Sequence, residues 1–76
     1  MSQNIGKVVE IIGPVVDIQF SQNNLPDLLT AIEIERPNEE NLIVEVEQDI
    51  GADRVRCIAM GSTDGLVRGM DAIDTK

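Results

Sequence analysis

Apolar and polar residues alternate along several stretches of the chain, with the period of two that a β-strand with one solvated face produces. The alternation predicts strands over residues 16–20, 32–35 and 44–47. A further stretch at residues 7–12 contains paired apolar residues, which predicts a strand that is covered on both faces or bends. Clusters of turn-forming residues separate these stretches, and they lie at residues 13–14, 23–27, 36–38, 49–53 and 61–65. The pattern favours an all-β domain, either a barrel or a sandwich.

One segment follows a different period. Its apolar residues are spaced at i, i+3, i+4 and i+7, as on one face of a helix, and Pro26 stands near its start, where a missing N–H group does no harm. These apolar residues are Leu25, Leu28, Leu29 and Ile32. We therefore predict at most one short helical turn, near residues 25–31.

The sequence also predicts an antiparallel hairpin in the second half of the chain. Opposite residues in such a hairpin share a constant index sum, and compatible residues should face each other. A sum of 101 gives the pairs Leu42–Ala59, Val44–Cys57, Val46–Val55, Glu45–Arg56 and Glu47–Arg54. A sum of 103 is also compatible and places Cys57 opposite Val46. The pattern thus defines which residues share a face of the hairpin and leaves open which of these two registers the strands adopt.

Length and composition exclude several classes of protein. The 76 residues fit one domain with a thin core. The absence of histidine and the presence of one cysteine exclude a His-based triad, a Cys/His zinc site and an internal disulfide. We interpret that cysteine, Cys57, as a small core residue. The sequence contains neither a signal or transit peptide pattern nor an apolar run long enough to insert directly into a membrane.

The chain is acidic, with a net charge of −8, and residues 27–49 carry seven of these net negative charges. Its one aromatic residue is Phe20. Nucleic-acid binding usually requires basic patches and stacking rings, so we predict no nucleic-acid partner. We interpret the carboxylates of the middle region as solvated strand faces and a turn; they are Glu33, Glu35, Glu39, Glu40, Glu45 and Glu47. Residues 49–53 lack the alternating carboxylates of an EF-hand loop.

Residues 61–69 are the region most similar to a binding loop, because they combine three glycines with hydroxyl groups, a carboxylate and an arginine. Backbone N–H groups of such a turn can cradle a phosphate. However, no lysine follows Gly65 or Gly69 as a P-loop requires, and Ser62 directly follows Gly61, unlike the serine of a nucleophile elbow. We predict a structural turn in which Gly61 and Gly65 adopt unusual backbone angles and Asp64 bonds the local backbone.

Asp71 and Asp74 are the remaining candidates for paired carboxylates. No neighbouring residues suggest a desolvating pocket that would separate their pKa values. We therefore predict no catalytic residue, no cofactor-binding residue and no metal ligand in this chain.

Two segments resemble the start of the catalytic β subunit of F-type ATP synthases. They are residues 6–17 (GKVVEIIGPVVD) and residues 55–60 (VRCIAM), the latter followed by residues 62–69 (STDGLVRG). The resemblance extends from about Gly6 to Thr75, and the related barrels of the α subunit and of flagellar or secretion ATPases resemble the second segment less well. The chain departs from the family at Gly61, where the family often has Asp, and at Lys76, where it commonly has Gly.

The resemblance implies a small six-stranded β-barrel, closed or nearly closed, over residues 6–75 after a flexible segment at residues 1–5. It implies a place in a crown of alternating α and β barrels, with α-subunit N-terminal barrels as partners. The parent subunit belongs to a rotary, proton-transporting ATP synthase whose peripheral catalytic head lies on the cytoplasmic face of a bacterial-type membrane. Its Mg-ATP or Mg-ADP site lies in a following nucleotide-binding domain, which is absent from this chain.

We expect the isolated chain to be mainly monomeric, because its charge disfavours contact between identical copies. An alternative function is a free-standing OB-like binding module without catalytic activity. Modules of that kind usually carry aromatic or basic residues on a strand face.

Overall fold

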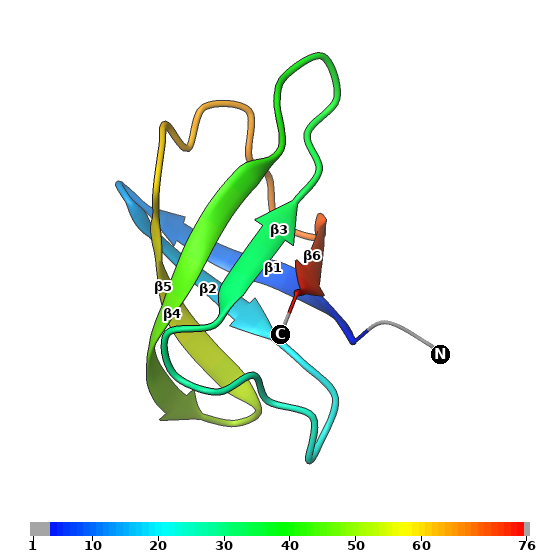
Figure 1. The fold of residues 1–76 in the computed structure, drawn as a ribbon, viewed down its shortest axis with the longest axis vertical. Helices are drawn as coiled ribbons and strands as arrows, with labels where there is room; N and C mark the ends of the chain where they lie inside the picture. The colour runs from blue at the N-terminus through cyan, green and yellow to red at the C-terminus, as the bar shows by residue number, and fades with distance from the viewer. Residues whose placement is uncertain (1–3, 76) are drawn as a thin grey trace.

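The computed structural model describes residues 4–75 of the chain, and across them the backbone forms six β-strands and no helix. The strands are β1 (Ile5–Ile12), β2 (Val15–Gln19), β3 (Ala31–Ile34), β4 (Leu42–Gly51), β5 (Arg54–Ala59) and β6 (Asp71–Asp74). Neighbouring strands are all antiparallel and follow one another in the order β1-β2-β5-β4-β3-β6. The short strand β6 pairs with both β1 and β3 and closes the barrel (Figure 1). The predicted all-β, six-stranded closed barrel is confirmed.

Alternate residues of each strand fill the interior of the barrel, as the period of two predicts. The buried apolar residues come from all six strands and from Phe20, which directly follows β2. They are Val8, Val16, Ile18, Phe20, Ile32, Ile34, Leu42, Val44, Val46, Val55, Cys57 and Ala72. Strand β1 bends, because its register against β2 shifts between Val8 and Glu10. The paired apolar residues of this strand therefore reflect a bulge.

Gly6 allows strand β1 to pass very close to the end of β2. A Cβ atom at this position would lie 2.7 Å from the backbone oxygen of Gln19 and 2.9 Å from side-chain atoms of Ile18 and Phe20. Carbon atoms do not approach backbone oxygens this closely without displacement of the chain. A glycine is therefore required where the first two strands pack together.

No helical turn forms near residues 25–31, which agrees with the predicted limit of at most one. The segment contains a β-turn, in which the N–H of Thr30 donates to the carbonyl oxygen of Asp27 over 3.2 Å. Leu29, at the third position of the turn, has a φ of 69°, as in type II turns. The N–H of Leu29 donates to the carbonyl oxygen of Val46 over 2.7 Å, so the backbone follows strand β4 and cannot close a helical turn. The helical spacing of the leucines is coincidental, because Leu28 is 60% exposed.

The hairpin of β4 and β5 adopts the register with the index sum of 103. Val46 faces Cys57 and Glu45 faces Ile58, so the Glu45–Arg56 and Glu47–Arg54 pairs of the alternative register are wrong. The register then shifts between Val46 and Gln48, and Gln48 faces Arg56. A bulge of this kind increases the local twist, which a small barrel needs in order to close.

The barrel has two ends, which Figure 1 shows at its top and bottom. We call the end that carries loop 35–41 and the start of loop 60–70 the upper end. We call the end that carries segment 20–30 and the hairpin turn between β4 and β5 the lower end. The flexible segment predicted at residues 1–5 lies mainly outside the described residues, which include Asn4 and the beginning of β1 at Ile5.

Candidate functional site

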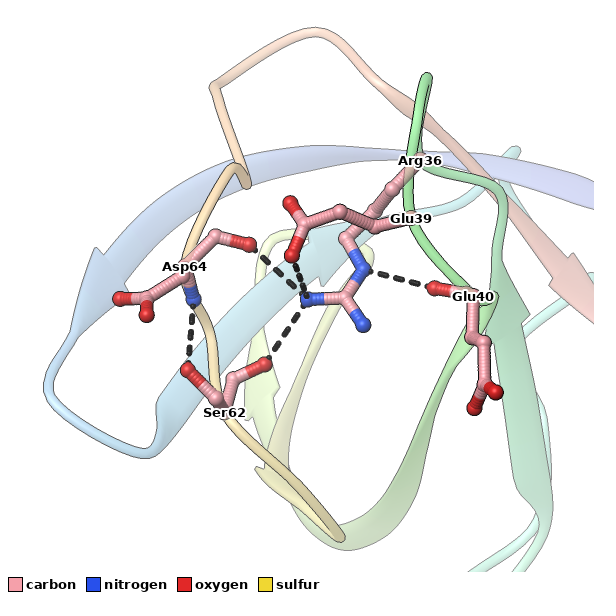
Figure 2. A network of polar contacts seen from close by, with 5 residues as sticks. All are labelled: Arg36, Glu39, Glu40, Ser62 and Asp64. Atoms are coloured by element: carbon pink, nitrogen blue, oxygen red, sulfur yellow. Dashed lines mark hydrogen bonds and ion pairs between the residues drawn. The ribbon is translucent and has the colours of Figure 1, made fainter.

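Arg36 joins the two loops at the upper end of the barrel (Figure 2). Its Nε donates to the carbonyl oxygen of Glu40 over 2.9 Å. Its Nη1 donates to the carbonyl oxygens of Ser62 and Asp64, over 3.0 Å and 2.9 Å. The carboxylate of Glu39 lies 3.9 Å from the same nitrogen, and the Arg36 side chain is only 9% exposed. We call these five residues the Arg36 cluster.

The Arg36 cluster shows what the glycine-rich turn does chemically. A phosphate cradle requires backbone N–H groups that converge on an anion, whereas here two carbonyl oxygens of residues 61–69 converge on a guanidinium group. Converging carbonyl oxygens suit a cation, and the Arg36 side chain supplies that cation. This arrangement agrees with the prediction that residues 61–69 form a structural turn.

Two details of that turn differ from the prediction. Gly65 and Gly69 have φ angles of 83° and 95°, but Gly61 does not have a positive φ, so the prediction of an unusual angle at Gly61 is wrong. The local side-chain bond is made by Ser62, whose hydroxyl oxygen accepts from the N–H of Asp64 over 3.1 Å. Asp64 was predicted as the side-chain partner of the backbone, and it instead contributes its own backbone groups.

Asp17 and Arg56 form a second polar contact on the outer wall, between β2 and β5. The guanidinium group donates to both carboxylate oxygens over 2.9 Å, and Asp17 is 3% exposed. The hydrogen bond and charge of Asp17 raise the pKa of Arg56, against the effect of desolvation. Sequence reasoning missed this pair, because β2 and β5 are far apart along the chain and no local pattern indicates their pairing. The pair is electrically neutral and bidentate, which indicates a structural role.

Cys57 lies in the core, as predicted, and has no exposed surface. Burial raises the pKa of its thiol to about 12, and the nearby charges of Asp17 and Glu47 add to the effect. A thiol in this environment stays protonated at neutral pH and is a poor nucleophile.

Asp71 and Asp74 do not form a carboxylate pair. They lie on opposite faces of β6, with Asp71 exposed and Asp74 8% exposed. Asp71 forms an ion pair with Lys7 on the outer wall, and Asp74 accepts a hydrogen bond of 3.4 Å from the side chain of Asn4. Among residues 4–75, no group of three or more Cys, Asp or Glu side chains is arranged to hold a metal ion.

An open groove of about 520 Å³ lies at the lower end. It is lined by Asn4, residues 23–27, Thr30 and Asp74. These residues provide amide and hydroxyl groups and two carboxylates but no lysine or arginine. A nucleotide phosphate would have no cationic partner in this groove.

The outer wall formed by the adjacent ends of β1, β2, β5 and β4 carries a row of apolar side chains. We call this row the Met60 patch; it consists of Ile12, Val15, Ile58, Met60 and Ile43. Ile12 pairs with Val15, Val15 with Ile58, and the N–H of Met60 donates to the carbonyl oxygen of Ile43 over 2.9 Å. Three of its members are notably exposed, at 59% for Ile12, 58% for Met60 and 37% for Ile43. Sequence reasoning missed this patch, because its members come from four strand ends that only the barrel brings together.

The structure therefore defines a small closed antiparallel barrel with an apolar outer patch. Residues 8–76 match the β-barrel domain of the ATP synthase alpha/beta family. The match covers most of the chain, and the protein belongs to this family, which is a family of rotary ATPases. Within the described residues there is no helix that could span a membrane.

Proposed function

We propose that the chain is the N-terminal barrel of an ATP synthase β subunit and that it joins α and β subunits in the crown of the hexameric catalytic head. The observation that carries the assembly role is the Met60 patch on the outer wall of a barrel of this family. A large apolar patch rimmed by polar residues usually marks a surface that another molecule covers. Residues 55–69 support the assignment to the β type, since they resemble the β subunit more closely than they resemble the related barrels of the α subunit and of flagellar or secretion ATPases.

In this proposal the barrel has a mechanical role. It holds neighbouring subunits in a ring while nucleotide-binding domains, which follow it in the parent subunit, change conformation. The parent complex makes ATP from ADP and phosphate with the energy of a transmembrane proton gradient, as a peripheral complex on the cytoplasmic side of the membrane. Mg-ATP or Mg-ADP binds to the following domain.

The alternative of an OB-like binding module has little support. The one aromatic residue, Phe20, is 4% exposed and lies in the core, so it cannot stack on a ligand. Of the arginines on β5, Arg56 is already paired with Asp17.

The test is a titration of the ¹⁵N-labelled chain with the N-terminal barrel of an ATP synthase α subunit, followed by NMR up to millimolar concentration. We expect saturable shifts of a subset of amide signals. We also expect a higher melting temperature in the presence of the α barrel, because a partner that binds only the native state stabilises it. A chain that shows no shifts at millimolar α barrel, or that forms a tight homodimer, would contradict the proposal.

A further inference from the structure

We propose that the Met60 patch is the surface on which a neighbouring barrel docks, and that the docking barrel presents an apolar centre bordered by basic side chains. This inference rests on the proposed function and identifies the contact surface and the charge of the partner. It concerns one wall of the barrel, formed by the adjacent ends of β1, β2, β5 and β4.

The strands and the loop around the Met60 patch are joined to one another by hydrogen bonds. The N–H of Ala59 donates to the carbonyl oxygen of Pro14 over 2.9 Å, which fixes the β1–β2 hairpin to β5. The hydroxyl of Thr63 donates to the carbonyl oxygen of Gly13 over 3.1 Å and fixes the same hairpin to loop 60–70. A surface that is already ordered loses little conformational entropy when it binds. The patch is therefore suited to a permanent contact with another folded surface.

The border of the patch determines the charge of its partner. Glu45 faces Ile58, and Glu33 faces Ile43, so two carboxylates lie beside the apolar row on β4 and β3. On the other side the charges of Arg56 and Asp17 cancel. The pKa of Glu47 is raised, first by a hydrogen bond with Glu45 and then by burial and the charge of Glu45, which shows that carboxylates on β4 are crowded. Basic side chains of a partner would relieve this crowding.

The same charges argue against a second copy of this chain as the occupant. Two copies would bring identical acidic borders together, and each carries a net charge of −8. Like charges placed together across an interface disfavour the complex. A homologous barrel with basic residues at the corresponding positions would complement both the apolar row and its acidic border.

The test compares matched variants in the NMR titration with the α barrel. Met60→Asp introduces a charge into the patch, and Val67→Asp introduces the same charge at a side chain of similar exposure, 57%, outside it. We expect Met60→Asp to weaken binding at least about tenfold, because a charge at the centre of an apolar contact is desolvated. Val67→Asp should change the affinity less than twofold. Circular dichroism verifies that both variants remain folded.

A second pair of variants tests the charge of the border. Glu45→Lys reverses a charge beside the patch, and Asp27→Lys makes the same change of net charge at the lower end. We expect the affinity to fall with Glu45→Lys much more than with Asp27→Lys, and the difference to shrink at high salt.

The outcomes separate this inference from the proposed function. If the unmodified chain binds the α barrel but Met60→Asp and Glu45→Lys bind as tightly as their controls, the Met60 patch is not the contact, although the assembly role stands. If the unmodified chain does not bind, the proposed function itself is overturned.

Discussion

The two ends of the barrel are held in different ways. At the upper end one side chain, Arg36, joins two loops by hydrogen bonds to three carbonyl groups. At the lower end segment 20–30 is held mainly by backbone bonds, from the N–H of Phe20 to the oxygen of Asp53 and from the N–H of Leu29 to the oxygen of Val46, with one side-chain bond from Asn4. The upper end therefore depends on the identity of one residue, whereas the lower end depends on the path of the backbone. Substitutions at the two ends should have different consequences.

At the lower end Gly6 packs directly against the backbone of a neighbouring strand, and of these substitutions Gly6→Ala should have the largest effect. The new Cβ would overlap the backbone oxygen of Gln19, which cannot move without displacing β2. We expect the free energy of unfolding to fall by about 1–3 kcal/mol, as for other overpacked sites. The measurement is urea denaturation followed by circular dichroism, since the chain has no Trp or Tyr.

Gly61→Ala is the matched control at the upper end. The nearest atom to its Cβ would be Leu42 Cδ1 at 3.6 Å, an ordinary contact, and its φ is not positive. Its stability should change by less than about 0.5 kcal/mol. Equal effects at Gly6 and Gly61 would show that the close packing at the lower end has been misinterpreted.

Arg36→Met should weaken the upper end by leaving three carbonyl groups without their donor. We expect a loss of about 1–2 kcal/mol in the free energy of unfolding, because these carbonyls can in part bond to water. Hydrogen exchange should accelerate in loop 35–41 and loop 60–70 together and remain unchanged in segment 20–30. Arg54→Met, at an exposed arginine of the lower end, is the control and should alter neither quantity. Faster exchange in only one of the two loops would contradict the joining role of Arg36.

Leu29→Gly should stabilise the lower end slightly. Leu29 has a φ of 69°, which costs an L-residue about 1–2 kcal/mol, while the greater freedom of an unfolded glycine costs about 0.5–1 kcal/mol. The side chain is 68% exposed, so little burial is lost. The net gain should be up to about 1 kcal/mol in urea denaturation. Leu28→Gly, where φ is negative, should instead be destabilising, and a gain at both positions would exclude strain at Leu29 as the cause.

In the wall between the two ends, Cys57 should make the stability of the chain depend on pH under alkaline conditions and not at neutral pH. Its thiol pKa is raised to about 12 in the folded chain, so folding favours the protonated form. The resulting contribution to stability is present in full below the pKa of the unfolded thiol. It is lost as the pH rises through the pKa of the folded thiol. Stability should therefore fall more steeply above about pH 9 than in Cys57→Val. Parallel pH curves for the two proteins, or rapid reaction of Cys57 with thiol reagents at neutral pH, would contradict the burial of this thiol.

The difference between the two ends also shows where sequence-based prediction succeeds. The alternation in β2, β3 and β4 correctly predicted which residues lie inside, because a strand has a fixed period and only one of its faces can be dry. No helical turn forms around Leu29, because two backbone bonds to β4 outweigh the helical spacing of a few leucines. Only the structure decided between the two registers of the hairpin. The bulge after Val46 provides curvature that the barrel needs, and the pairing preferences of the hairpin residues do not predict it.

The sequence by itself determined the all-β class, the inward face of the strands, the buried state of Cys57 and, through the resemblance of its motifs, membership of the ATP synthase alpha/beta family. Each of these depends on residues that are neighbours along the chain or share a strand period. Only the tertiary structure decided the Asp17–Arg56 pair, the Arg36 cluster and the Met60 patch. These features join strands and loops that are distant along the chain. Their positions follow from the closure of the barrel, which local sequence patterns do not encode.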